Sequence, residues 1–91
     1  MVVTDEAIAE AVCHILSTAR TRQYVVTARA VMRELGEEIR NGALRAVLRR
    51  YGFRFIRHGP VDSVPKYVVD VESARPICQK IRERRKKKSG F

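Results

Sequence analysis

The sequence predicts a small α+β domain in which three helices precede a β-hairpin and a last helix. Between residues 24 and 71, two short segments with helical spacing of apolar residues run into two segments in which apolar residues alternate. The chain has 91 residues, of which 45% are hydrophobic, so there is room for one core only. We therefore expect one domain over residues 1–81 and a flexible basic tail over residues 82–91.

The first predicted helix covers residues 5–19. Thr4 is suited to cap it, and Asp5 and Glu6 place negative charge in the first turn, where the helix dipole favours it. Several apolar residues recur at helical spacing and predict one buried face: Ile8, Val12, Ile15, Leu16 and Ala19.

A short strand and a second helix follow. Residues 23–26 are β-prone, as expected for a strand that closes onto a later hairpin. Thr27 is placed to cap a helix over residues 28–35, and Gly36 is placed to end it.

A third helix carries the candidate binding residues. Asn41-Gly42 is a dipeptide typical of hairpin turns, but helical spacing continues directly after it and nothing before it alternates like a strand. We therefore predict a helix that begins at Arg40 or Asn41 and runs to Tyr51, with Gly52 as its end. Its core-facing residues are expected to be Leu44, Val47, Leu48 and Tyr51.

The opposite face of this helix is polar. Asn41, Arg45 and Arg49 stand four residues apart, which places them in a row along the helix. Arginine can recognise guanine through two parallel hydrogen bonds, and asparagine can recognise adenine in the same way. Arg40 and Arg50 flank the row and are expected to meet phosphates.

Residues 53–57 and 66–71 predict the two strands of the hairpin. The loop between them holds two prolines and a glycine, and it is long enough to project. Aromatic and branched residues that alternate along the strands give the sheet one buried face: Phe53, Phe55, Tyr67, Val69 and Val71.

Ser73 is expected to cap the last helix, with Pro76 tolerated in its first turn. Ile77, Cys78 and Ile81 are expected to dock on the body of the domain. Beyond them the chain has nothing left to bury, and the tail holds the basic residues Arg84, Arg85, Lys86, Lys87 and Lys88.

The net charge of +9 is concentrated in two segments. Residues 39–66 hold six arginines and Lys66 against one acid, and residues 75–91 hold eight bases against one acid. A balance of this kind favours polyanions, either nucleic acid or, less often, an anionic membrane surface. No apolar run approaches the length of a membrane span, and the N-terminus lacks the pattern of a signal peptide, so we expect an intracellular, cytoplasmic protein.

Two cysteines are too few for a disulfide scaffold. Cys13 and Cys78 are interpreted as two buried thiols in preference to a single bridge between the first and last helices. A metal site that combines them with His14 and His58 is disfavoured, because the spacing matches no zinc pattern and adjacent helical residues point apart. No nucleophile–base pair, paired carboxylates or phosphate-binding loop is apparent, so we predict no enzyme, no cofactor and no metal.

Helix, tight turn, basic helix and hairpin follow one another over residues 24–71, and this segment resembles a winged helix-turn-helix domain. In that family the helix after the turn is the recognition helix, and the hairpin is the wing. The resemblance implies that Arg40, Asn41, Arg45 and Arg49 are recognition residues and that Arg54, Arg57 and Lys66 are wing contacts. Glu37 and Glu38 depart from the pattern, because acids at the turn would face phosphates poorly unless they cap the next helix.

Charge and resemblance together imply a DNA-binding protein, either a transcriptional regulator or an architectural factor, associated with the nucleoid. Two alternatives stay open: an RNA-binding or ribosomal protein with a winged-helix body, and a winged-helix subunit that binds other proteins. Homodimerisation through the first and last helices is also left open, and no membrane partner is expected.

Overall fold

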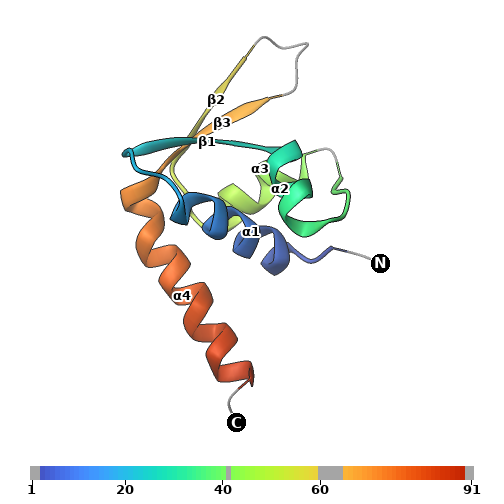
Figure 1. Ribbon diagram of the computed structural model, residues 1–91, viewed down its shortest axis with the longest axis vertical. Coiled ribbons are helices and arrows are strands. Elements are labelled where there is room, and N and C mark those ends of the chain that lie inside the picture. The colour runs from blue at the N-terminus through green and yellow to red at the C-terminus, as the bar shows by residue number, and fades with distance from the viewer. Residues whose placement is uncertain (1–2, 41, 60–64, 90–91) are drawn as a thin grey trace.

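The computed structural model describes residues 3–40, 42–59 and 65–89, with side chains through Arg84. Within these ranges the chain forms four helices and a three-stranded antiparallel sheet (Figure 1), which confirms the predicted α+β class. The elements in chain order are α1 (Asp5–Ser17), β1 (Gln23–Thr27), α2 (Ala28–Leu35), α3 (Ala43–Arg50), β2 (Phe55–His58), β3 (Lys66–Asp70) and α4 (Val71–Ser89).

Helix α1 is the centre of the helical layer, because α2, α3 and α4 all pack against it. The Thr4 hydroxyl accepts a hydrogen bond from the Ala7 amide at 3.1 Å, as predicted for the cap. The helix ends at Ser17, two residues earlier than expected. Its last turn is closed by hydroxyl groups, since Ser17 donates to the His14 carbonyl and Thr18 donates to the Ile15 carbonyl.

The sheet has the strand order β1-β3-β2, so the segment predicted as a short strand does pair with the hairpin. Val26, Tyr67 and Val69 are buried on the face that covers the helices. Phe55 packs edge-on against Tyr67, with ring centroids 5.5 Å apart and an interplanar angle of 85°. The hairpin extends away from the helices on the side opposite to α4 (Figure 1).

Strand β2 begins two residues later than predicted. Phe53 precedes the strand and lies buried, and its amide donates to the Leu48 carbonyl at the end of α3 at 2.9 Å. Because of this bond, Phe53 belongs to the turn after α3 and not to the strand. The pairing with β3 therefore starts at Phe55.

The last helix begins directly where β3 ends, so the predicted cap at Ser73 is wrong. One carboxylate oxygen of Asp70 accepts the Glu72 amide at 3.2 Å, and the Ser73 hydroxyl donates back to the Asp70 carbonyl. As a result Pro76 lies inside the helix, beyond its first turn. The helical backbone continues to Ser89, through the segment that was assigned to the tail.

Replacement of Leu48 by alanine tests the core. Leu48 is the largest of the fully buried side chains, so its truncation should leave a cavity and lower the free energy of unfolding by about 3 kcal/mol. Leu35→Ala, at a half-buried position on α2, should cost clearly less. Urea unfolding of the three proteins measures both, and equal losses would contradict the assignment of Leu48 to the centre of the core.

Candidate nucleic-acid interface

Helix α3 has one buried face and one basic face. Leu44, Val47 and Leu48 point into the core, as predicted, and each is at most 2% exposed. Arg45 and Arg49 are exposed and four residues apart, so they stand one turn above each other on the outer edge. The eight residues of α3, ALRAVLRR, include no acid that would neutralise this edge.

The start of α3 differs from the prediction. The helix begins at Ala43, and its N-cap is Gly42, which has a left-handed φ of 81° and gives no side-chain capping bond. Arg40 lies before the turn, where its carbonyl accepts the Ala43 amide at 3.0 Å and its side chain is exposed. Neither Arg40 nor Asn41 is therefore the cap. Asn41, the predicted first member of the recognition row, lies outside the described residues.

One interpretation of the sequence was that the two acids before this turn cap α3. Glu37 and Glu38 are exposed in the connection between α2 and α3. They do not cap α3, because that helix starts at a glycine without a side-chain bond. Gly36 ends α2 as predicted, with a φ of 71° and its amide bonded to the Met32 carbonyl at 2.8 Å.

Arg50 lies on a different side of α3 from Arg45 and Arg49. Its guanidinium contacts the Asp5 carboxylate at 2.7 Å, which links the end of α3 to the start of α1. Both side chains are largely exposed, so the pair contributes under about 1 kcal/mol and does not hold the arginine strongly. Arg50 was predicted to meet phosphate, and its contact with Asp5 was not predicted.

The hairpin brings together two of its three predicted contact residues. Arg57 pairs with Tyr67 and His58 pairs with Lys66, so Arg57 and Lys66 are neighbours at the outer end of the sheet, on opposite faces. Arg54 is at the other end, just before β2, where its carbonyl accepts the Asp70 amide at 2.9 Å. Its place beside the start of α4 separates it from the wing contacts with which it was grouped.

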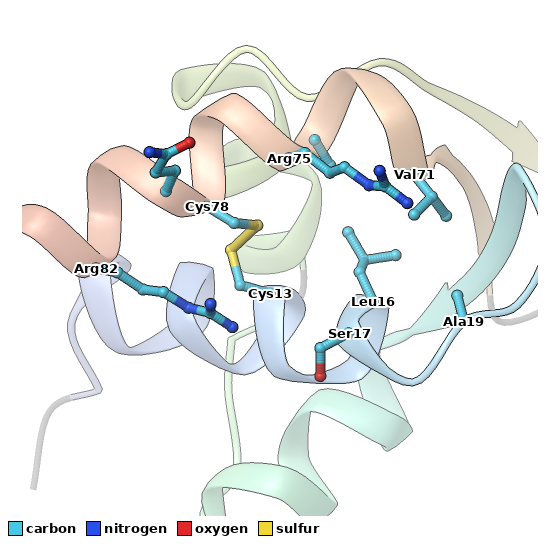
Figure 2. Close-up of a pocket in the computed structure, with 10 residues that line it drawn as sticks. Cys13, Leu16, Ser17, Ala19, Val71, Arg75, Cys78 and Arg82 are labelled. Carbon is cyan, nitrogen blue, oxygen red and sulfur yellow. A yellow bond between two sulfur atoms is a disulfide. The ribbon is translucent and has the colours of Figure 1, made fainter.

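Helix α4 adds three basic residues that were not predicted for the site, Arg75, Lys80 and Arg82, to Arg84, which was predicted for it as part of the basic tail. Arg75 and Arg82 line a groove of about 470 Å³ between α1 and α4, on either side of a disulfide bond (Figure 2). Lys80 and Arg84 line a second hollow, of about 310 Å³, which they share with Arg50. Helical spacing is the signal that could have found them, because residues 75 and 82 share one flank and residues 80 and 84 share the other. The side chains of Arg85, Lys86, Lys87 and Lys88 lie outside the described part of the chain.

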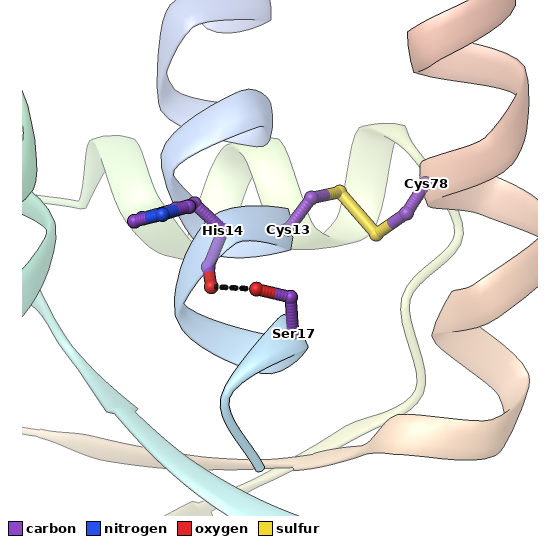
Figure 3. The surroundings of a disulfide bond; sticks show 4 residues. All are labelled: Cys13, His14, Ser17 and Cys78. Atoms are coloured by element: carbon purple, nitrogen blue, oxygen red, sulfur yellow. Dashed lines mark hydrogen bonds between the residues drawn. A yellow bond between two sulfur atoms is a disulfide. The ribbon is translucent and has the colours of Figure 1, made fainter.

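The disulfide joins Cys13 of α1 to Cys78 of α4, with a Cα–Cα distance of 5.6 Å (Figure 3). The preferred interpretation of two buried thiols is therefore wrong, and the alternative of a single bridge is confirmed. His14 points away from the bond, and its Nδ1 contacts the carboxylate of Glu34 of α2. It is exposed, as predicted.

In the described part of the chain, no helix has an apolar stretch long enough to cross a membrane. Comparison with known proteins adds no family to this picture. No protein-family model matches the chain, and neither a curated protein nor a solved structure matches it.

Proposed function

We propose that the protein binds duplex DNA through the exposed edge of α3, as a transcriptional regulator or an architectural factor of the nucleoid. The observation that carries the proposal is the pair Arg45 and Arg49. Both guanidinium groups are exposed on a helix whose opposite face is fixed in the core by Leu44, Val47 and Leu48. A helix anchored in this way can present its arginines to base edges in the major groove without rearrangement.

The order of the elements supports a winged helix-turn-helix interpretation. A helix, a tight turn and a basic helix are followed by a hairpin, and the strand before α2 pairs with that hairpin. In this interpretation α3 is the recognition helix, and the β2–β3 hairpin is the wing. Arg57 and Lys66, at the outer end of the hairpin, would contact the DNA backbone beside the groove.

Much of the affinity should come from phosphates. The described part of the chain exposes basic side chains on α3, on the hairpin and on both flanks of α4. Each phosphate that these residues neutralise releases counterions, so binding should be strong at low salt and should weaken steeply as salt is added. The net charge of +9 acts in the same direction and favours rapid association.

Fluorescence anisotropy with a labelled duplex tests the proposal. If about six phosphates are engaged, a plot of log K against log salt concentration should have a slope near −5. A structured RNA of equal length is measured over the same salt series. Absence of duplex binding at about 50 mM salt contradicts the proposal, and a clear preference for RNA would favour the ribosomal type of function instead.

A further inference from the structure

The outer face of the sheet carries an apolar strip. In the described residues the exposed large hydrophobic side chains are Tyr24, Val25 and Ile56, and all three belong to the sheet. Val25 and Ile56 are 45% and 59% exposed, and the register places both of them directly opposite Val68 of the central strand. The three aliphatic residues Val25, Val68 and Ile56 therefore form one line across the face that does not cover the helices, here called the apolar rung.

Charged residues flank the apolar rung on the same strand. Lys66 and Asp70 each lie two residues from Val68, so both share its face, at about 7 Å on either side of it. The pattern along β3 is therefore positive, apolar, negative. A surface of this kind is complementary to a copy of itself that has been turned end for end.

We propose that a second copy of this chain docks on this face, with a two-fold axis that runs along the apolar rung. That axis is perpendicular to the strands, so the strands of the second copy run in the opposite direction. Each strand then lies over the same strand of the second copy. Val25, Val68 and Ile56 then each meet their own counterpart, while Lys66 lies over Asp70 of the second copy and Asp70 lies over Lys66. The interface is isologous, as a closed dimer requires.

Polar groups of β1 fit the same axis, whereas on β2 the axis places Arg54 over His58 of the second copy, a contact that adds no attraction. On β1 it places Gln23 over Thr27 of the second copy, where an amide and a hydroxyl can form a hydrogen bond. Asp70 keeps one oxygen on the Glu72 amide and makes no ion pair within the described part of its own chain, so its other oxygen can accept from lysine. Beside Ile56, a shallow hollow of about 450 Å³ leaves room for the opposing isoleucine.

The first and last helices fit a second copy less well than the sheet does. α1 is covered by α2, α3 and α4 within one chain, and the Cys13–Cys78 bond ties it to α4. Among the residues that the structure describes, none covers the apolar rung in this way, and Val25 and Ile56 stay exposed. The dimer shares Lys66 with the proposed wing contact, but Val25 and Ile56 have no part in the proposed nucleic-acid binding, so crosslinking through these two positions tests the dimer separately.

The size of the face determines how strong the dimer can be. Three short strands present a surface about 15 Å on a side, well below the roughly 800 Å² per partner of a standard interface. We therefore expect a weak dimer, with a dissociation constant on the order of 100 µM. In sedimentation-velocity runs at about 0.15 M salt, the average mass should rise from 10.4 kDa at 10 µM toward twice that value at 1 mM.

Charge exchange tests the ionic part of the interface. Lys66→Glu places two carboxylates over each other at both ends of the rung, and Asp70→Lys places two ammonium groups there. Each variant alone should stay monomeric at 1 mM. An equimolar mixture should dimerise at least as well as the original protein, because both contacts then join opposite charges. Circular dichroism checks the fold of Asp70→Lys, since that change also removes the cap of α4.

Cysteine crosslinking tests the axis and does not depend on the cap. Both native cysteines are bonded to each other, so Val25→Cys or Ile56→Cys introduces the single free thiol. Each of these variants should form a disulfide-linked dimer under mild oxidation, at least about 10-fold faster than the control Arg29→Cys on the exposed side of α2. Crosslinking only in a mixture of the two variants would indicate an axis parallel to the strands and would overturn the proposed geometry. A chain that stays monomeric at 1 mM overturns the dimer itself.

Discussion

Replacement of Arg45 and Arg49 by glutamate is expected to abolish specific binding to duplex DNA. The two arginines form the exposed edge of α3, and each can supply a bidentate contact worth about 1–3 kcal/mol. Reversal also brings two carboxylates toward phosphates. Together these effects should lower the association constant at least about 100-fold at 100 mM salt, as measured by fluorescence anisotropy.

A matched control separates position from net charge. Arg20→Glu combined with Arg22→Glu changes the net charge by the same amount at two exposed arginines between α1 and β1. This variant should lower the association constant only a few-fold, because it makes the overall electrostatic potential of the protein less positive. Equal losses in the two variants would show that α3 has no special part in binding.

A second pair of changes separates base recognition from attraction to phosphates. Arg45→Lys with Arg49→Lys keeps the charge but removes the planar fork that grips guanine from two sides. Affinity for random duplex should change little, while any preference for a selected sequence should fall. If sequence preference survives, the bases are read by other residues, and the row on α3 serves the backbone alone.

Reduction of the Cys13–Cys78 bond is expected to lower stability more than any other single chemical change to this chain. The bridge joins positions 65 residues apart and therefore constrains most of the unfolded chain. A loop of that size corresponds to about 4 kcal/mol of stabilisation. For a domain of this length, the midpoint of thermal unfolding should fall by on the order of 20 °C on addition of a strong reductant.

The variant Cys13→Ser combined with Cys78→Ser is the control for this measurement. It should unfold at the same lower temperature with or without reductant, since it has no bond to break. A shift of less than about 5 °C in the original protein on reduction would mean that packing between α1 and α4 is sufficient without the bond. Val71 and Ala74 of α4, which are buried beside Leu16 of α1, would then supply it.

Sequence periodicity was a good guide to the helices and to their buried faces. Val12 and Leu16 of α1, like the apolar residues of α3, lie where helical spacing predicted them, because burial of an apolar face is a local property of the pattern. Boundaries were less predictable where an alternative hydrogen bond was available. Phe53 has the alternation of a strand residue but donates its amide to Leu48, and Asp70 has the place of a strand residue but also caps α4.

The candidate site was predictable only in part, for reasons that involve tertiary structure. The spacing of Arg45 and Arg49 was enough to place them on the exposed face of their helix. The contact between Arg50 and Asp5 could not be predicted, because the two residues are 45 positions apart in sequence. Likewise, nothing local showed that Cys13 meets Cys78, or that Val25 and Ile56 line up on either side of Val68, since these relations arise from packing and strand register.

The position of the disulfide also decides how the molecule would carry tension. A pull between the first and last residues passes along the start of the chain, crosses from Cys13 to Cys78 and leaves through the remainder of α4. Residues 1–13 and 78–91 lie on that load path, 27 residues in all, so the molecule could lengthen to at most about 97 Å. The sheet, α2 and α3 all belong to the loop that the disulfide closes, so they bear no tension while the bond is intact. Tension would reach Arg45 and Arg49 of α3 only after the bond is reduced.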